Sequence, residues 1–364
     1  MDAYTLLRRV LFSMPAEFSH DFSLKSLALA ERLKLINAVG GDRKLQFAGQ
    51  GDESVTLFGL RFPNRVGLAA GLDKNGDYFP ALAQFGFGFL EIGTITPEAQ
   101  SGNAKPRMYR LEAHEAIINR MGFNNKGVGY LSNQVKAYPF HAQKYHRHPF
   151  ILGINVGKNK LTSEADALKD YELAMEQVFE LAHYITVNIS SPNTPGLRNL
   201  QFGDSLKTLL RGVDLKRREL AEKFGTNKPI LVKVAPDMEF DELDRVLDIL
   251  LEFNMDGVIA TNTTVERDSV ADSRHGKELG GLSGAPLTQK SYAVCEHLAN
   301  RIAQQKLVFP LISVGGIMSA DEAARRISCG ADLVQLYSGF IYKGPALVTQ
   351  SRLAILQANN KRAA

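Results

Sequence analysis

The chain has 364 residues, of which 45% are hydrophobic and 23% are charged, a composition typical of ordered globular proteins and unlike that of disordered or fibrous ones. Lys and Arg exceed Asp and Glu by 43 − 39 = 4, an excess too small and too dispersed to indicate nucleic acid as a partner. Cys295 and Cys329 are the only cysteines and match no C-x-x-C pattern, so neither a disulfide framework nor a zinc site is expected. A reducing, cytosolic environment fits this usage.

The first 40 or so residues differ from the rest of the chain. Arg8 and Arg9 interrupt the apolar stretch, which argues against a secretory signal, and no later window reaches the roughly 18 apolar residues of a spanning helix. Helical spacing predicts two short amphipathic helices divided by Pro15, with apolar residues at Tyr4, Leu7, Leu11 and Met14 in the first and at Phe18, Phe22, Leu29 and Leu33 in the second. The segment is either a helical lid or an interfacial membrane anchor.

Eight short β-branched runs follow, each pair separated by a stretch able to form a helix, and this alternation predicts a closed parallel (β/α)₈ barrel. We expect the barrel to occupy residues 41–364 as one domain. The expected strands span residues 65–71, 89–94, 151–157, 184–190, 230–235, 257–263, 311–317 and 333–339. The expected helices include residues 164–182, 205–223, 239–253 and 319–328.

Three connections are longer than a barrel needs, and each follows the carboxyl end of an expected strand. They span residues 95–149, 191–203 and 264–285. Barrel enzymes place their sites on this face. The site is therefore expected there.

The strongest local signal is the run VNISSPNTPGLRNLQ, residues 187–201. A period of two places Thr186, Asn188 and Ser190 on one face of a strand, which we expect to point into the barrel. Asn188 and Asn193 offer amide donors and acceptors that suit a small planar polar ligand. Ser191 and Asn193 also fit a second interpretation, in which the Ser-Pro-Asn-Thr-Pro-Gly run is a rigid turn without catalytic duty.

Asparagine recurs near the ends of other expected strands, at Asn119, Asn155 and Asn262. Several amides at one mouth favour a neutral or anionic heterocycle over a metal ion, which prefers carboxylates and histidines. The histidines of residues 141–148 are interpreted as solvated surface, and no metal site is expected. These are His141, His146 and His148.

Two lysines lie on or just past expected strands, Lys74 in AAGLDKNG and Lys233 in LVKVAPD. A buried ammonium needs an anionic neighbour or a lowered pKa, and either suggests function. The alternative for Lys233 is a lysine that reaches the barrel rim.

Glycine loops occur at residues 280–284, 314–317 and 337–339, and the last two end the seventh and eighth expected strands. Barrel enzymes hold phosphate groups there. None of these loops matches G-x-G-x-x-G or a P-loop, so a phosphate-bearing cofactor on the barrel mouth is favoured over a Rossmann-type site.

Ten motifs together resemble dihydroorotate dehydrogenase, and specifically its membrane-associated, quinone-using class. They cover nearly the whole chain in the family's order: AAGLDKNG, EIGTITP, INRMGFNN, LGINVGKNK, VNISSPNTPGLR, VKVAPD, GVIATNTT, GGLSG, VGGI and LVQLYSGFIYKGP. The serine at Ser191, where soluble classes have cysteine, and the N-terminal extension both select the quinone class.

The resemblance implies one FMN per chain and a pocket for dihydroorotate, the substrate, and orotate, the product. The FMN site would be formed by Ala70, Gly71, Leu72, Asp73, Lys74, Thr94, Asn155, Asn188, Lys233, Thr261, Gly284, Gly316, Tyr337 and Ser338. The substrate pocket would be formed by Lys74, Asn119, Arg120, Met121, Gly122, Phe123, Asn188, Asn193, Asn262 and Thr263.

Further implications concern the reaction and its setting. Ser191 would be the catalytic base, and His20, Arg110 and Tyr337 would lie along the route of the quinone. The protein would be a monomer bound peripherally to the lipid surface at the cytoplasmic face of the inner membrane, acting in pyrimidine biosynthesis. One rival interpretation is another FMN-dependent barrel oxidoreductase, with Ser191 merely structural, and a second is a flavin-free lyase in which Lys233 forms a Schiff base. A third, a non-enzymatic membrane-surface binding module, is disfavoured by the many polar groups expected at one mouth.

Overall fold

The computed structural model describes residues 3–36, 51–138 and 149–363. The expected domain boundary near residue 40 and the histidines at 141, 146 and 148 lie outside these ranges. Eight parallel strands close into a barrel in the order β10-β12-β13-β3-β4-β7-β8-β9, so the predicted (β/α)₈ architecture is confirmed. Their bounds are β3 Val66–Leu68, β4 Phe89–Ile95, β7 Ile151–Val156, β8 Tyr184–Asn188, β9 Ile230–Val234, β10 Gly257–Ala260, β12 Leu311–Val314 and β13 Leu333–Leu336.

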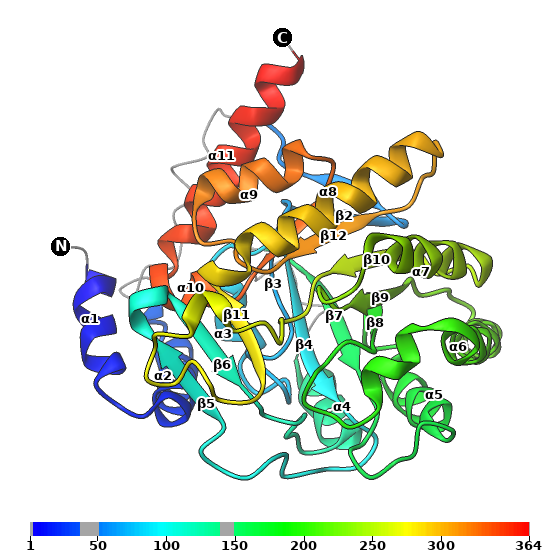
Figure 1. Cartoon of the computed structure of the whole chain (residues 1–364), viewed down its shortest axis with the longest axis horizontal. Coiled ribbons are helices and arrows are strands. Elements are labelled where there is room, and N and C mark those ends of the chain that lie inside the picture. Colours follow the sequence, from blue (N-terminus) through cyan, green and yellow to red (C-terminus); the bar gives the residue numbers. More distant parts are fainter. Residues whose placement is uncertain (1–2, 37–50, 139–148, 364) are drawn as a thin grey trace.

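Helices between the strands form the outer layer (Figure 1). They are α3 Phe79–Ala83, α4 Val128–Ala137, α5 Ala167–Val178, α6 Gly203–Phe224, α7 Phe240–Glu252, α8 Thr288–Gln304, α9 Ala320–Ser328, α10 Ser338–Lys343 and α11 Ala346–Ala363. Local chemistry sets several of their ends. Glu239 and Glu242 form a capping box at the start of α7, and the Ser319 hydroxyl accepts a hydrogen bond from Glu322 N at the start of α9.

The barrel interior is filled by side chains of very different size from neighbouring strands. A Cβ on Gly67 would lie 2.3 Å from the Phe89 ring, and one on Gly153 would lie 2.2 Å from the Tyr184 ring, so each glycine makes room for an aromatic residue. A hairpin of β1 (Val55–Leu57) and β2 (Leu60–Phe62) covers the amino-terminal end of the barrel, where Phe62 packs edge-on against Phe89. That end is therefore a packed core, which leaves the carboxyl ends of the strands for a site.

A second, antiparallel sheet lies above the carboxyl ends of the strands and was not expected. It pairs β5 (Met108–Leu111) with β6 (Ala116–Asn119) and β6 with β11 (Gly281–Gly284). The prediction of a glycine loop over residues 280–284 was therefore wrong, because most of this run is strand β11. The strand needs glycine where neighbouring residues pack closely against its backbone. A Cβ on Gly281, for example, would lie 1.9 Å from Thr263 Oγ1.

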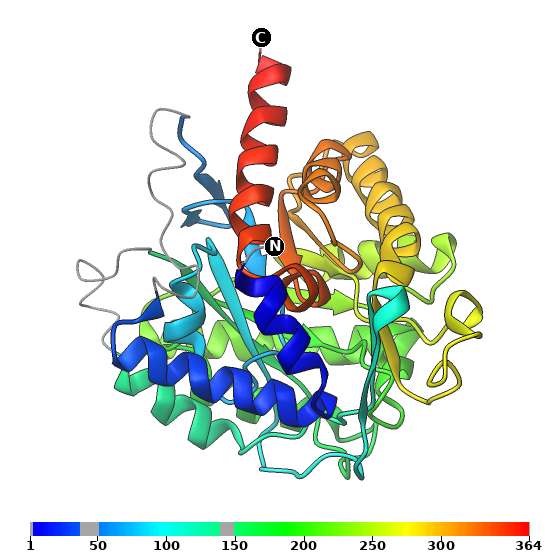
Figure 2. The same ribbon diagram turned by 90° about the vertical axis from the view of Figure 1, so that its left-hand side faces the viewer.

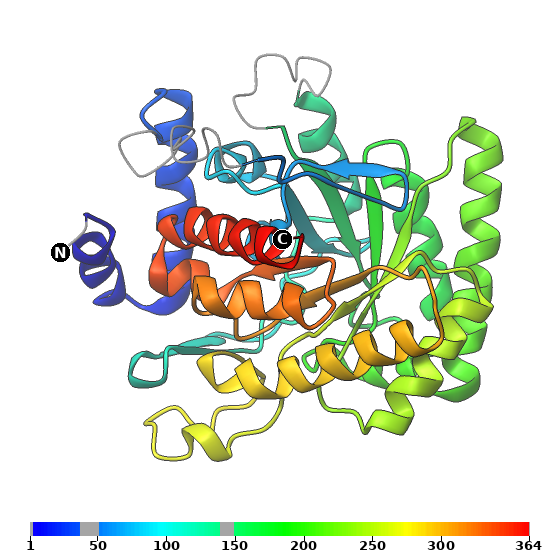
Figure 3. The same cartoon turned by 90° about the horizontal axis from the view of Figure 1, so that it is seen from above.

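Two N-terminal helices, α1 (Ala3–Phe12) and α2 (Ala16–Arg32), lie outside the ring of barrel helices, with Pro15 between them as predicted. Figure 2 shows both in blue on one face, and Figure 3 shows them on the side of the molecule opposite α5 to α7. Among the described residues, none of the helices combines the length and apolarity needed to cross a bilayer. The short helices η3 (Glu112–His114), η5 (Leu197–Gln201), η6 (Asp268–Val270) and η7 (Ala285–Leu287) complete the structure.

Candidate functional site

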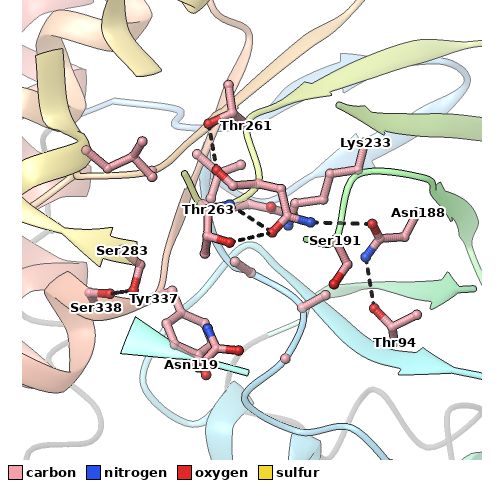
Figure 4. A pocket seen from close by; sticks show the side chains of 18 of the residues that line it. Thr94, Asn119, Asn188, Ser191, Lys233, Thr261, Thr263, Ser283, Tyr337 and Ser338 are labelled. Carbon is pink, nitrogen blue, oxygen red and sulfur yellow. Dashed lines mark hydrogen bonds between the residues drawn. The ribbon is translucent and has the colours of Figure 1, made fainter. Parts of the chain in front are cut away.

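A cavity of about 1000 Å³, measured out to its open mouth, lies at the carboxyl ends of the barrel strands. It is lined by residues from the three long connections and the ends of the strands, which is where sequence patterns placed the site. Ser191 and Lys233, which belong to separate stretches of the chain, both line it, together with the amides of Asn119 and Asn188 (Figure 4). The Asn193 amide lines it as well. A cavity of this size with a few convergent polar groups is typical of a cofactor or substrate site.

Most of the residues that the family resemblance implied for the cofactor and the substrate line this one cavity. They are Ala70, Gly71, Lys74, Thr94, Asn119, Met121, Gly122, Phe123, Asn188, Asn193, Lys233, Thr261, Asn262, Thr263, Gly284, Gly316, Tyr337 and Ser338. Four other implied residues do not line it: Leu72, Asp73, Arg120 and Asn155. Leu72 lines a neighbouring cavity instead, and the Arg120 guanidinium points to Glu278, 2.7 Å away, and to Tyr109.

Asp73 and Asn155 support the cavity from behind. The Asp73 carboxylate accepts hydrogen bonds from Asp77 N and Tyr78 N, which shapes the turn that follows Lys74. Asn155 Oδ1 accepts from Thr94 Oγ1 at 2.5 Å and from Asn188 Nδ2 at 3.1 Å. Asn155 thus orients two side chains that do line the cavity.

A chain of amide and hydroxyl contacts forms one wall of the cavity. Asn188 Nδ2 donates to Thr94 Oγ1 at 2.9 Å, and Asn188 Oδ1 accepts from Ser190 Oγ at 3.1 Å and from Asn262 Nδ2 at 3.4 Å. Because each group is oriented by its neighbour, these side chains present a fixed pattern of donors and acceptors. Ser191 Oγ accepts from the Asn193 backbone N–H at 3.2 Å, which is the turn chemistry that the sequence also suggested.

A buried ionic network lies beneath this wall, inside the barrel. The Glu91 carboxylate is 1% exposed and accepts hydrogen bonds from Asn155 Nδ2, Tyr184 Oη and Gln335 Nε2 at 2.7–3.1 Å. Burial lowers the pKa of Lys233, and the negative charge of Glu91 partly opposes this shift. An inward, buried lysine with an anionic neighbour is the arrangement that favours a functional role, not a lysine that reaches solvent at the rim.

Glycines and serines form the opposite end of the cavity. Gly315 and Gly316 have φ values of +112° and +66°, and a Cβ on Gly316 would lie 2.4 Å from Thr288 Cα. Ser338 Oγ donates to Ser283 Oγ at 2.9 Å, and Figure 4 shows this pair well apart from Asn188, Ser191 and Lys233. The cavity thus has a glycine-rich end and an amide-rich end.

Sequence reasoning missed two polar residues of the site. Gln335 belongs to β13 and lies two residues before Tyr337, which follows the strand, so a strand period of two could have identified it. Its Oε1 is buried and has no hydrogen-bond partner among the described residues, which leaves an acceptor for a ligand. Ser283 lies within the glycine run of residues 280–284 but was not singled out, because its position depends on the pairing of β11 with β6 across more than 150 residues of sequence.

A second cavity lies between the N-terminal helices and the barrel and is largely apolar. Counted out to its mouth, it measures about 1270 Å³ and is lined by Leu7, Leu11, His20, Leu72 and Arg110, among other residues. The predicted stripe on α1 therefore faces the barrel. The resemblance implied a quinone route along three residues. Two of them, His20 and Arg110, line this cavity, and the third, Tyr337, lines the polar cavity.

Arg110 fastens the first helix over this cavity. Its guanidinium donates to Leu11 O, Phe12 O and Met14 O and lies 4.6 Å from the centre of the Phe12 ring. Leu11 and Phe12 are the last two residues of α1 and Met14 lies just beyond it, at the end of a helix where backbone acceptors lack helical partners. Burial and, to a smaller extent, the charge of Lys74 lower the pKa of His20 to about 3, so its imidazole is neutral near pH 7.

The outer faces of both N-terminal helices also carry apolar side chains. Leu6, Val10, Phe18, Leu29 and Leu33 are each between 57% and 62% exposed. An apolar face this exposed is unusual on a soluble surface and is typical of a contact with lipid or protein. The helices thus cover a cavity on the barrel and also present an exposed apolar face.

Cys295 and Cys329 are free thiols, although their Sγ atoms lie 3.6 Å apart. Within residues 3–36, 51–138 and 149–363, no group of three or more His, Cys, Asp and Glu side chains is arranged to hold a metal ion.

The fold and the two cavities together define a (β/α)₈-barrel protein. It has a polar ligand cavity at the carboxyl ends of its strands and an apolar cavity beneath the helices α1 and α2. A family model described as dihydroorotate dehydrogenase matches residues 53–356. The chain therefore belongs to the dihydroorotate dehydrogenase family.

Similar proteins cover nearly the whole chain. It is 51% identical over 356 residues to the dihydroorotate dehydrogenase (quinone) of Saccharophagus degradans, covering 98% of this chain and 99% of that protein. It is 52% identical over 352 residues to the protein of the same name from Cellvibrio japonicus, covering 97% and 98%. It also resembles the crystal structure of the Eimeria tenella dihydroorotate dehydrogenase in complex with ferulenol, with a TM-score of 0.84 and 34% identity over 95% of this chain and 92% of that one.

Proposed function

We propose that this protein oxidises (S)-dihydroorotate to orotate, with FMN as the hydride acceptor and a membrane quinone as the final electron acceptor, in pyrimidine biosynthesis. Membership of the dihydroorotate dehydrogenase family supports the reaction, and the names of its relatives support the quinone. The single observation that carries the proposal is the convergence of Ser191, Lys233 and four asparagine amides on one cavity with a glycine-rich end.

The residues of the cavity fit FMN. Gly315, Gly316 and Gly339 expose backbone at one end, where a phosphate would meet N–H groups and the Ser338 hydroxyl. Lys233 and Gln335 both line the cavity, and they would offer a flat polar ring system a positive charge and, at the unpaired Gln335 Oε1, an acceptor. FMN bound there would supply the hydride acceptor that none of the amino-acid side chains provides.

Dihydroorotate would occupy the amide-rich end. Asn119, Asn193 and Asn262 supply donors and acceptors for its ring amides, and the Lys74 ammonium supplies a positive charge for its carboxylate. Ser191 would remove the ring proton. A serine hydroxyl is a weak base, so it requires a site that is closed to bulk water and a neighbour that accepts its own proton. Ser191 is 6% exposed, consistent with such a site.

The apolar cavity would receive the quinone, and the N-terminal helices, residues 1–40, would form its entrance beside the catalytic barrel, residues 41–364. Leu72 lines the apolar cavity while Gly71 and Lys74 line the polar one, so a short segment separates the two. The exposed face of α1 and α2 would rest on the lipid surface, so the protein would be bound to it peripherally. The family resemblance implies the cytoplasmic face of the inner membrane and a monomer.

Replacing Ser191 by alanine tests the catalytic role directly. The variant should bind FMN like the wild type, because the side chain's one hydrogen bond accepts from the backbone of the same turn. Reduction of the bound flavin by dihydroorotate, followed by absorbance after rapid anaerobic mixing, should slow by about 100-fold or more. Ser191→Cys, which introduces the residue of the soluble classes, is the matched control and should retain more activity. Near-normal flavin reduction in Ser191→Ala would refute the assignment.

A further inference from the structure

A buried ion pair joins helix α2 to the barrel mouth. The Arg107 guanidinium is bound to the Glu17 carboxylate through Nε at 3.1 Å and Nη2 at 2.8 Å. The Arg107 side chain is 7% exposed and that of Glu17 is 15% exposed, so the pair is largely shielded from water. Lys105 Nζ also lies 3.1 Å from Glu17 but is 66% exposed, which makes it the weaker contact.

The other nitrogen of Arg107 holds a loop of the first long connection. Arg107 Nη1 donates to Ser101 O at 2.6 Å and to Asn103 O at 2.9 Å. These carbonyls accept their hydrogen bonds from a guanidinium whose charge is balanced by Glu17, and Glu17 belongs to helix α2, not to the barrel. Removing the balancing charge would leave Arg107 buried and unpaired, which favours a rearrangement of the loop that it holds.

Asn103, held by Arg107, is hydrogen-bonded in turn to segments at the amide-rich end of the polar cavity. Its backbone N–H donates to Met121 O at 3.1 Å, and its side-chain amide donates to Arg120 O at 2.9 Å and to Asn193 O at 3.4 Å. Met121 and Asn193 line the cavity. The loop carrying Asn103 therefore fixes two segments that surround the proposed dihydroorotate site, one of them two residues from Ser191.

The charge of Glu17 acts on a residue in each of the two cavities. Its negative charge raises the pKa of His20, in the apolar cavity, and that of Lys74, in the polar cavity, against the larger lowering that burial causes. One carboxylate on the N-terminal helix thus acts on both sites.

We infer that Glu17 is a positioning residue for the substrate pocket, so that docking of helix α2 and binding of dihydroorotate or orotate are coupled through Arg107 and Asn103. The inference rests on the proposed function. Coupling of this kind is reciprocal: docking of α2 tightens the substrate pocket, and a ligand in that pocket holds α2 on the barrel. The helix that would admit the quinone is therefore also part of the substrate site's support.

Orotate binding to the full-length, FMN-loaded protein tests the coupling without turnover. Titration of the oxidised protein with orotate, followed by the flavin spectrum, should show a dissociation constant about 5- to 20-fold higher for Glu17→Gln than for the wild type, within the usual range of coupling between sites. Glu31→Gln makes the same chemical change near the other end of α2 and should stay within about twofold of the wild type. Glu17→Asp, which keeps the charge, should restore most of the affinity.

Hydrogen exchange measures the reciprocal effect. Saturating orotate should slow amide exchange across residues 16–32 in the wild type, and this protection should be lost in Glu17→Gln. A merely local role for the ion pair would speed exchange in the variant without any dependence on orotate.

Two outcomes overturn the coupling: equal orotate affinity in Glu17→Gln and the wild type, or no effect of orotate on exchange in α2. If Glu17→Gln does not yield folded, FMN-loaded protein, the exchange measurement on the wild type decides alone. A wild type that binds no orotate refutes the proposed function instead, so the two failures are distinguishable.

Discussion

Replacing Arg326 by methionine should destabilise the barrel and disturb the glycine-rich end of the cavity. Arg326 on α9 has no exposed surface, yet it carries a charge balanced by Glu322, whose Oε1 lies 2.6 Å from Nε. Its other nitrogens donate to Ser313 Oγ, Thr288 O, Ser291 Oγ and Gly315 O at 2.8–3.3 Å. One guanidinium therefore ties α8, β12 and α9 to the loop that begins at Gly315.

The size of the effect follows from these contacts. Breaking a buried ion pair by removing one partner costs about 3–5 kcal/mol, and the acceptors left behind cannot all reach water. Methionine recovers part of this by filling the space with an apolar chain. We expect a loss of about 4 kcal/mol in the free energy of unfolding, which a protein of ordinary stability survives. Arg325→Met is the matched control, because Arg325 is 43% exposed and pairs with the same Glu322 at 3.5 Å, and it should cost under about 1 kcal/mol.

Urea denaturation followed by far-UV circular dichroism measures the stability, since the chain has no tryptophan. Binding of FMN and of riboflavin, which lacks the phosphate, should be compared in the same variants. Arg326→Met should weaken FMN binding more than riboflavin binding, because the disturbed loop is the one proposed to meet the phosphate. Equal stability of the two arginine variants, or an equal loss of both flavins, would refute this reasoning.

Three further predictions concern charged groups around the two cavities. Burial, with a smaller contribution from the charge of Arg107, lowers the pKa of Lys74 to about 8. The affinity for orotate should therefore fall by about fivefold between pH 8 and 9, as the ammonium loses its proton. In a titration followed by the flavin spectrum, Lys74→Gln should abolish this pH dependence. The folded protein protonates His20 only near pH 3, whereas the unfolded chain does so near 6.5, so stability is lost as the pH falls below 6.5. The loss due to His20 should reach about 2 kcal/mol by pH 5, and urea denaturation of His20→Gln should lack it. Arg110→Ala leaves the Phe12 and Met14 carbonyls without their partner and removes one of two donors to Leu11 O, so limited proteolysis within α1 should accelerate. Reoxidation of the reduced flavin by decylubiquinone should slow, and unchanged reoxidation would be the contrary result. Flavin reduction by dihydroorotate is the control and should be unchanged.

The barrel could be predicted from the sequence because its strands are buried on both faces and appear as short apolar runs between helical patterns. Residues 184–188, for example, form β8 within the expected run. The expected strands extend too far at their carboxyl ends. For example, β10 was expected to end at Thr263 but ends at Ala260. There the backbone leaves the ladder to place Thr261 and Asn262 in the cavity.

The second sheet could not be predicted, because its pairings carry no local signature. β6 meets β11 across more than 150 residues, and the glycines of β11 fit a loop equally well in the sequence. The Glu17–Arg107 pair was missed for the same reason, since the two residues lie 90 positions apart and neither stands out in its own segment. Gln335 and Glu91, by contrast, lie in phase with inward-facing neighbours on β13 and β4, and the strand period would have identified them.

The most direct measurement is the visible spectrum of the purified, FMN-loaded protein before and after anaerobic addition of dihydroorotate. The yellow absorbance should disappear with formation of one orotate per flavin, and added quinone should restore it. A protein that holds no flavin, or whose flavin stays oxidised with dihydroorotate present, would contradict the proposed function.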